Sequence, residues 1–353
     1  MTKINTLIIW DSTSKPQSFQ NPLMLWNSYE HETSREIFSI CEIVENNAKK
    51  LRTKYLKFVY DLGELEVNNQ QIIKHLELKP NFSYWWMTLI NEKCNFSKSP
   101  EINDSIKILA LESWLKENSF ESIHISSSNK SLVDSLKMLC KHLSINFSEE
   151  ILIKNDLEIN FYKKIFHSLP YILRSLVWFI YHLIKMWPLK GVGISKWSKT
   201  KAKITFVSYL FNLDFEHKKN GVFKSHYWTV LPEKLKENNL KSNWLHIFVE
   251  NEVIPNAVEA KNTIIDFNKT YSGEQTHATL HSFLSFKVII SVLMDWFFII
   301  RIQTRLKKIV KKKSNFLWPF LKNDFLSSFI GPTSINNLLV FNLFQAAMGK
   351  IPK

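Results

Sequence analysis

A strand–helix–strand pattern in residues 122–147 constrains the fold more than any other feature of the chain. Ser122–Ser126 (SIHIS) alternates as a half-buried strand does, and a polar loop leads from it into helical spacing over 132–143. Ile145–Phe147 then predicts another short strand. Strands joined through a helix in this way run parallel in one sheet, with a right-handed crossover. The pattern therefore predicts an α/β fold with a parallel sheet.

Further patterns extend this sheet towards the N-terminus. Leu7–Trp10 (LIIW) breaks into a polar loop and predicts a first strand, and Tyr55–Tyr60 alternates like another strand. Pro100 and Glu101 are typical of a helix start, and the helical spacing continues to about Asn118. We expect residues 1–156 to form a Rossmann-like domain.

The second half repeats the pattern only in part. Ile204–Tyr209 and Leu245–Val249 predict two strands, with a helix over Pro232–Asn238 between them. We expect residues 157–200 to form apolar, basic linking helices, and residues 201–353 to form a partial second α/β segment that ends in long helices. Two strands make a thin sheet, so either the first domain completes it or the chain ends before the second domain is finished.

Charge and composition restrict the function. With 46 Lys and Arg against 32 Asp and Glu, the net charge is +14, which favours an anionic partner such as a phosphorylated substrate, an acidic lipid surface or nucleic acid. Seven glycines argue against a glycine-rich phosphate loop, and Lys196 stands where a dinucleotide motif starting at Gly191 needs its third glycine. The three cysteines have no metal spacing, so we expect reduced thiols in a cytosolic protein and no metal or cofactor.

An apolar segment with a polar stripe covers residues 161–187. Arg174 and Lys185 argue against a membrane-spanning helix, which leaves a helix in the lipid interface or a core helix between domains as the favoured alternatives. The polar members of the stripe recur every three or four residues: His167, Tyr171, Arg174, Trp178, His182 and Lys185.

A second apolar segment is followed directly by a dense run of cations. Phe286–Ile300 is strongly apolar but contains Lys287 and Asp295, and seven Lys or Arg residues follow between positions 301 and 313. Such a run beside an apolar helix favours an anionic bilayer surface, although a solvated helix end would also carry cations. The cations lie beside apolar helices, no recognised nucleic-acid module is present, and we expect no nucleic-acid partner.

Polar residues follow three of the expected strands, and ligands of open parallel sheets gather at such carboxyl ends. The serine-rich run also suits an anion at a helix start, although Ser and Asn are ordinary helix caps. The expected substrate-binding residues are Ser12, Thr13, Ser126, Ser127, Ser128, Asn129, Lys130, Tyr209 and Asn212.

Three residues are candidates for proton transfer. His226 lies between a cation and two rings in KSHYW, and Asp11 and Glu92 are carboxylates suited to deprotonate an acceptor hydroxyl. A loop histidine with a structural hydrogen bond is the alternative for His226. The rings of Ser83–Trp86 (SYWW), which precede Glu92, either fill the core beside the sheet or form a ligand-facing wall.

Several stretches together resemble bacterial surface-carbohydrate (O-antigen type) biosynthesis proteins. They are LIIWDSTSK at the start, SYWWMTLINEKCNFSKSP with the following INDSIKILALESWL, and ITFVSYLFNLD with FKSHYWTVLPEKL. The resemblance implies two Rossmann-like halves in a GT-B-like arrangement, the second of them incomplete here.

The resemblance also implies a function, glycosyl transfer from a nucleotide-sugar donor to a lipid-linked glycan acceptor. It implies that the protein is cytoplasmic and peripheral to the inner face of the plasma membrane. Members of the family continue beyond an ending such as this one, so we expect a truncated chain. The alternative is a non-catalytic, membrane-associated scaffold or partner subunit of a glycan-assembly complex.

Overall fold

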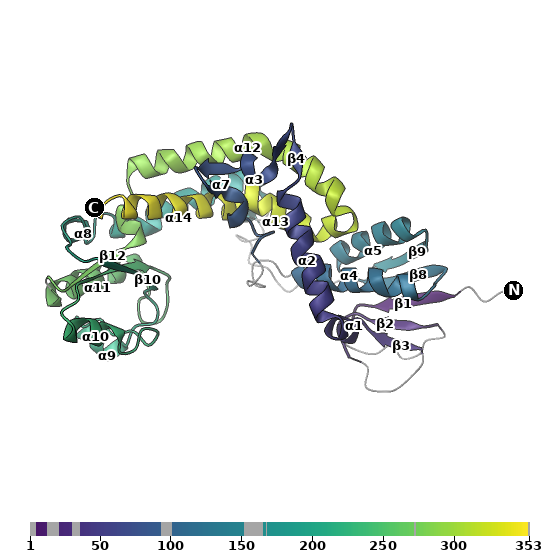
Figure 1. Ribbon diagram of the computed structural model, residues 1–353, viewed down its shortest axis with the longest axis horizontal. Helices are drawn as coiled ribbons and strands as arrows, with labels where there is room; N and C mark the ends of the chain where they lie inside the picture. Colours follow the sequence, from purple (N-terminus) through teal and green to yellow (C-terminus); the bar gives the residue numbers. More distant parts are fainter. Residues whose placement is uncertain are drawn as a thin grey trace. The chain divides into compact units, whose positions relative to one another are not determined.

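The chain folds into two compact units (Figure 1). Unit 1 comprises Met1–Tyr171 and Ile299–Gly331, and unit 2 comprises Ile172–Phe298 and Pro332–Lys353. The computed structural model describes residues 5–12, 21–29, 36–92, 101–151, 165–166, 168–271 and 273–351.

These units differ from the expected division at residues 156 and 200, because the C-terminal helices return to both of them. Residues 299–331 belong to unit 1, where the Ser135 hydroxyl donates a hydrogen bond to the carbonyl of Phe316 at 2.6 Å. The last stretch belongs to unit 2, where the indole of Trp197 donates to the carbonyl of Ala347 at 3.2 Å. Local patterns along the chain carry no signal for such long-range returns.

Five parallel strands form the sheet of unit 1, in the order β3-β2-β1-β8-β9. The expectation of an α/β fold with a parallel sheet is thus confirmed. At the centre of the sheet, Leu7 and Ile9 of β1 are fully buried. The strands are β1 (Thr6–Trp10), β2 (Leu23–Leu25), β3 (Ile37–Ser39), β8 (Ser122–Ser127) and β9 (Asn146–Ile151).

The predicted strand over Tyr55–Tyr60 is wrong, because these residues lie within the helix α2 (Ala48–Gly63). Leu51, Tyr55, Val59 and Leu62 are buried, which is the spacing of one helix face.

Unit 1 also contains the helices α1 (Ile40–Asn46), α3 (Ile72–His75), α4 (Glu101–Glu117), α5 (Lys130–Leu143) and α13 (Trp318–Phe329). Two short antiparallel ribbons pair β4 (Glu66–Val67) with β5 (Gln70–Gln71) and β6 (Glu77–Lys79) with β7 (Phe82–Ser83).

The aromatic run of SYWW forms the short 3-10 helix η1 (Tyr84–Met87). Tyr84 and Trp85 are fully buried, whereas Trp86 is 55% exposed. The Tyr84 hydroxyl donates to the carbonyl of Ser328 in α13 at 2.6 Å, so Tyr84 packs on a helix from the far end of the chain. Tyr84 and Trp85 therefore have the expected core role, with α13 as a packing partner of Tyr84, whereas Trp86 does not.

Unit 2 contains a second parallel sheet, of order β10-β11-β12. Two strands were predicted, and the third is β12 (Gln275–Thr279), beside β10 (Ile204–Tyr209) and β11 (Ser242–Ile247). Strand β12 has the sequence QTHAT. Its residues are mostly polar, so hydropathy does not indicate that this strand is buried.

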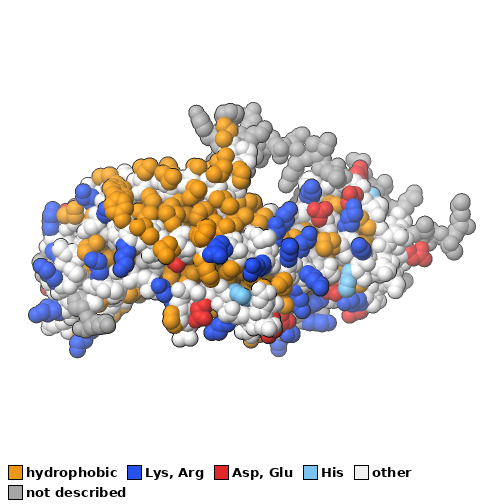
Figure 2. All heavy atoms as spheres, turned by 90° about the horizontal axis from the view of Figure 1, so that it is seen from above, with side chains coloured by type: hydrophobic (Ala, Val, Ile, Leu, Met, Phe, Trp, Pro, Cys, Tyr) orange, Lys and Arg blue, Asp and Glu red, His pale blue; other side chains and the backbone are white. Residues whose placement is uncertain are grey.

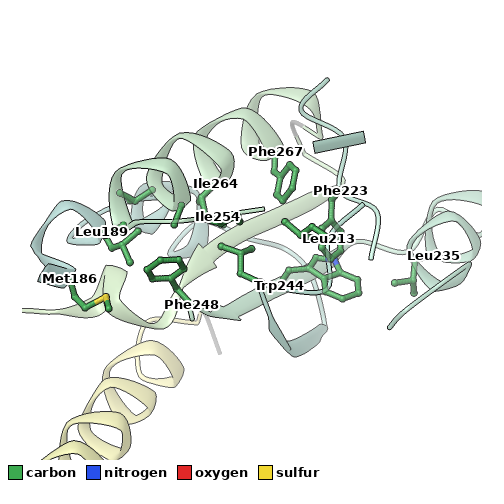
Figure 3. Close-up of a cluster of buried hydrophobic side chains, with 14 residues drawn as sticks. Met186, Leu189, Leu213, Phe223, Leu235, Trp244, Phe248, Ile254, Ile264 and Phe267 are labelled. Carbon is green, nitrogen blue, oxygen red and sulfur yellow. The ribbon is translucent and has the colours of Figure 1, made fainter. Parts of the chain in front are cut away.

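The core of unit 2 lies between this sheet and α11 (Ala257–Thr270) (Figure 3). Trp244 of β11 stacks on Phe206 of β10 with ring centroids 4.6 Å apart, and Ile264 and Phe267 of α11 are fully buried. The remaining helices are α7 (Tyr171–Met186), α8 (Ile194–Trp197), α9 (Phe215–Lys219), α10 (Leu231–Glu237), α12 (Phe286–Ser314) and α14 (Pro332–Met348), with the 3-10 turns η2 (Trp187–Leu189), η3 (Leu280–Phe283) and η4 (Asn315–Leu317). Of these, α12 continues into unit 1, where η4 lies.

Helix α7 turns its polar stripe towards unit 2. His182 contacts His281 of η3, with 3.0 Å between their Nε2 atoms, and Lys185 forms an ion pair with Glu250 at 2.6 Å. Only Ser175, Phe179 and Met186 of this helix are buried. His167, the first predicted member of the stripe, lies outside the described residues. Among the helices that the structure describes, none combines the length and the apolar character needed to cross a bilayer.

Four histidines of unit 2 form two contacting pairs. Besides the pair of His182 and His281, His246 and His277 are fully buried in the sheet, with Nε2 of the former 3.0 Å from Nδ1 of the latter. Burial lowers the pKa of His182 to about 4, and that of His246 and His281 to about 3. Burial lowers the pKa of His277 as well. A neutral imidazole pair shares one N–H between two nitrogens, which a doubly protonated pair cannot do.

Unit 2 should therefore lose stability in acid. Each histidine is held neutral in the folded state, so its contribution is complete above pH 6.5. It is lost as the pH falls from 6.5 towards about 4 for His182 and towards about 3 for His246 and His281. For each histidine that stays neutral in the folded state, each pH unit below the unfolded pKa lowers the free energy of unfolding by about 1.4 kcal/mol. Urea titrations across this range measure the loss. His182→Gln should reduce the pH dependence of the free energy of unfolding. Equal pH dependence in wild type and H182Q would contradict the assignment.

Candidate functional site

The strand order of unit 1 reverses between β1 and β8, which is where open parallel sheets bind ligands. Asp11 follows β1 directly, and Ser126 and Ser127 end β8. Asn129 then caps α5, because its side-chain oxygen accepts a hydrogen bond from the N–H of Leu132 at 3.2 Å. Parallel pairing of β1 and β8 places these residues at one edge of the sheet.

Hydrogen bonds join the residues at this carboxyl edge into one cluster. The Ser127 hydroxyl donates to Oδ2 of Asp11, and Asn27, which follows β2, donates to Oδ1 of Asp11 at 2.6 Å. Oγ of Ser127 also accepts from the N–H of Asn129 at 2.8 Å. The structure thus brings Asp11, which follows the first predicted strand, together with Ser127 and Asn129 of the serine-rich run.

A second carboxylate, Asp104 in the first turn of α4, extends the cluster. Its Oδ1 accepts from the buried indole of Trp26 at 2.9 Å, and its Oδ2 accepts from the side chain of Asn129 at 3.1 Å. Burial raises the pKa of Asp104 above its ordinary value, and the charge of Asp11 acts in the same direction. The hydrogen bond from Trp26 and the charge of Lys107 oppose this rise in pKa.

Lys107 supplies a cation to the same edge. Its amine donates to the carbonyl of Trp26 at 2.8 Å and to the side-chain oxygen of Asn27 at 3.0 Å. The sequence analysis missed Asn27, Asp104 and Lys107. The available signal was the position of Asp104 in the first turn of a predicted helix, where acidic residues are usually assigned to the helix dipole alone.

The other predicted residues of unit 1 lie around or away from this cluster. Ser12 is next to Asp11, and the Ser126 hydroxyl donates to Glu150 at 2.8 Å. Ser128 is half-buried, Lys130 is exposed at the start of α5, and Thr13 lies outside the described residues. Glu92 lies in the turn after η1, a segment anchored on α13 by the N–H of Leu89, which donates to the Ser328 hydroxyl at 2.8 Å.

Unit 2 has a hollow of about 350 Å³ at the carboxyl end of β10. Aromatic rings dominate its walls: Tyr209 and Phe211 have centroids 5.0 Å apart, and the indole of Trp228 donates to the Ser208 hydroxyl at 2.7 Å. Its lining residues are Val207, Ser208, Tyr209, Phe211, Asn212, Tyr227 and Trp228.

The hollow unites two of the residues predicted from strand ends, Tyr209 and Asn212. The predicted base His226 is exposed, and its backbone N–H donates to the carbonyl of Asn212 at 2.8 Å. Its side chain is not part of the lining. Exposed rings with a few polar groups suit the flat face of a sugar or a nucleobase.

Comparisons with known proteins do not identify a family for this chain. No protein-family model, curated protein or solved structure matches this chain. The class that the fold defines is an α/β protein with two parallel sheets, each of which carries polar or aromatic residues beyond strand ends.

The bond from Trp26 to Asp104 should contribute measurably to the stability of unit 1. Trp26→Phe keeps most of the ring volume but leaves Oδ1 of Asp104 without its buried donor. Losing a hydrogen bond to a charged group costs about 1.5–3 kcal/mol, which a urea titration of the free energy of unfolding measures. Trp86→Phe, at a ring that is 55% exposed, is the matched control. Indistinguishable losses in the two variants would mean that the hydrogen bond carries no stability.

Proposed function

We propose that this chain is a glycosyltransferase-like protein of surface polysaccharide (O-antigen type) assembly. It binds a nucleotide-sugar donor and works at the cytosolic face of the plasma membrane on a lipid-linked acceptor. The observation that supports this proposal most directly is the aromatic hollow of unit 2, which follows the carboxyl end of a parallel strand. Its volume lies within the usual range for small-molecule sites.

The rings of the hollow are the proposed contacts to the donor. Tyr209, Phe211 and Tyr227 are all exposed, so a planar ligand gains stacking area without moving core residues. Stacking of a base on an aromatic side chain contributes about 1–3 kcal/mol. Asn212 and the hydroxyl of Ser208 add polar groups that orient a sugar or a base. The net charge of +14 favours the diphosphate of such a donor.

Considered by itself, unit 1 offers a carboxylate suited to accept a proton, in the carboxyl-edge cluster. Inverting sugar transfer requires a carboxylate that removes the proton of the acceptor hydroxyl. Asp104 suits this role better than Asp11, because burial raises the pKa of Asp104 and makes the carboxylate a stronger base. Asn27 and Lys107 then act by holding the strand ends around the two carboxylates.

One observation favours a second candidate function, a non-catalytic partner subunit of a glycan-assembly complex. Both oxygens of Asp11 accept hydrogen bonds from side chains of the same unit, and both oxygens of Asp104 do so as well. Carboxylates bonded in this way also serve to hold strand ends and helix starts together. A protein of this kind binds the donor or its product without transferring the sugar.

Loss of an aromatic wall should weaken donor binding. Tyr227 is 69% exposed and lines the hollow, so Tyr227→Ala removes stacking area while the core stays intact. We expect the Kd for nucleoside diphosphate sugars, measured by titration calorimetry, to rise about tenfold. Val230→Ala changes a similarly exposed residue outside the lining and should leave the Kd unchanged. Equal affinity in Y227A and wild type would exclude the hollow as the donor site.

Sugar transfer separates the two candidate functions. In an assay with lipid-linked acceptor, Asp104→Asn should lower the rate of transfer about a hundredfold or more without changing donor affinity. Asp134→Asn, on the exposed face of α5, is the control and should retain the wild-type rate. A wild-type chain that binds the donor but transfers no sugar would support the partner subunit.

A further inference from the structure

Unit 2 exposes a broad apolar surface, the α7–α12 face, built from α7, η2 and the first half of α12. Figure 2 shows it as a continuous orange area. Ile184 and Phe286 are the most exposed members, at 69% and 70%. The face comprises Ile172, Leu173, Val177, Ile180, Tyr181, Ile184, Trp187, Phe286, Ile290, Leu293, Met294, Phe297 and Phe298.

Two regular stripes make up this face. On α7 and η2, Leu173, Val177, Ile180, Ile184 and Trp187 recur every three or four residues, which places them on one side of a helix. Phe286, Ile290, Met294 and Phe297 do the same on α12. The two stripes meet where the rings of Trp187 and Phe286 touch edge-on, with centroids 6.4 Å apart.

The inward side of α7 shows that this exposure is built into unit 2. A helix with one apolar side normally buries that side and exposes its polar stripe. Here the polar residues His182 and Lys185 contact His281 and Glu250 of unit 2, and the apolar side is outward. An apolar surface of this extent on a folded unit marks a binding surface for a partner or a membrane.

The charges around the face indicate which partner fits. The Lys190 amine lies 4.3 Å from the ring centroid of Trp187 and 5.2 Å from that of Phe286, and Lys287 is exposed next to Phe286. Aromatic rings with lysines at the edge of an apolar surface are typical of the interface between lipid tails and headgroups.

The acidic residues near the face are already paired. Asp295, the acid within the apolar half of α12, accepts a hydrogen bond from Asn342 of α14 at 2.9 Å. Glu250 is paired with Lys185. A second copy of the chain would bring the same cationic edge with it, whereas an anionic bilayer complements that edge.

Building on the membrane location proposed above, we propose that the α7–α12 face is a docking surface for an anionic lipid bilayer. The two helices lie in the plane of the interface, with their apolar side chains among the upper acyl chains and Lys190 and Lys287 at the headgroups. An open apolar hollow of about 600 Å³ between Ile180, Ile184 and Trp187 offers space for part of an acyl chain. Beyond Phe298, α12 continues with exposed cations that belong to unit 1 and are not part of the α7–α12 face.

Vesicle binding tests the docking surface without any sugar ligand. The full chain is mixed with vesicles of phosphatidylcholine alone or with phosphatidylglycerol added, and co-sedimentation is measured at low and high salt. We expect binding to the anionic vesicles at low salt, weaker binding at high salt, and little binding to the neutral vesicles.

Two double variants assign the binding to this face. Ile184→Asn with Met294→Gln should weaken binding about tenfold or more by removing exposed apolar contacts. Lys190→Gln with Lys287→Gln should weaken it by a similar factor on anionic vesicles only. The control, Val258→Asn with Lys261→Gln, changes exposed residues of α11, outside the face, and should bind like wild type.

Three results would overturn the proposal: no binding of the wild-type chain to anionic vesicles, equal losses in the control variant, or a dimer that the apolar variant converts to a monomer without any vesicle binding. The last result would make the face an interface between two copies. Calorimetry with nucleoside diphosphate sugars in the absence of vesicles reports separately on the hollow of unit 2. Failure of the docking surface and failure of the donor site are therefore distinguishable.

Discussion

Parallel pairing of β1 with β2 and β8 is the constraint on which the candidate site of unit 1 depends. Parallel strands place all their carboxyl ends at one edge of the sheet, so residues distant in sequence meet there. Asp11 and Ser127 are 116 positions apart, yet they share a hydrogen bond. Because Leu7 and Ile9 are fully buried, a shift of β1 by one residue would expose its core side chains, so the register is strongly specified.

The arrangement of α7 on unit 2 depends on a different interaction, the contact between polar side chains in the interior, where apolar packing is usual. His246 and His277 contact each other inside the sheet, and His182 of α7 contacts the buried His281. Lys185 of α7 adds a solvent-accessible ion pair with Glu250 of the same unit. These contacts hold α7 with its polar stripe inward. The outward apolar side then remains available for the proposed bilayer contact, and the sheet positions the aromatic hollow at the end of β10.

Much of the first sheet could be predicted from the sequence, and the misses have physical reasons. Strands β1, β8 and β9 and helix α5 follow from clear periodicity and caps. Strands β2 and β3 have three residues each, too few for any period to appear. The strand expected at Tyr55–Tyr60 is helical, since a short apolar run fits both periods and the burial of Leu51 and Leu62 decides between them.

The candidate site residues also divide into those that the sequence predicted and those that it missed. The rule that ligands bind at strand ends selected Asp11, Ser127 and Asn129, and the same rule selected Tyr209 and Asn212 in unit 2. It missed Asp104 and Lys107, which lie on a helix and join the cluster through side chains.

The sequence by itself determined the parallel arrangement of the first sheet, the polar residues at several strand ends, and an apolar segment at 161–187 with one polar stripe. These depend on local spacing and on capping chemistry, which act over a few residues. Only the tertiary structure decided which side of α7 faces outward and which distant side chains surround Asp104. Both outcomes depend on partners such as His281, Glu250 and Trp26, because burial and hydrogen bonding act between residues that the chain brings together only when it folds.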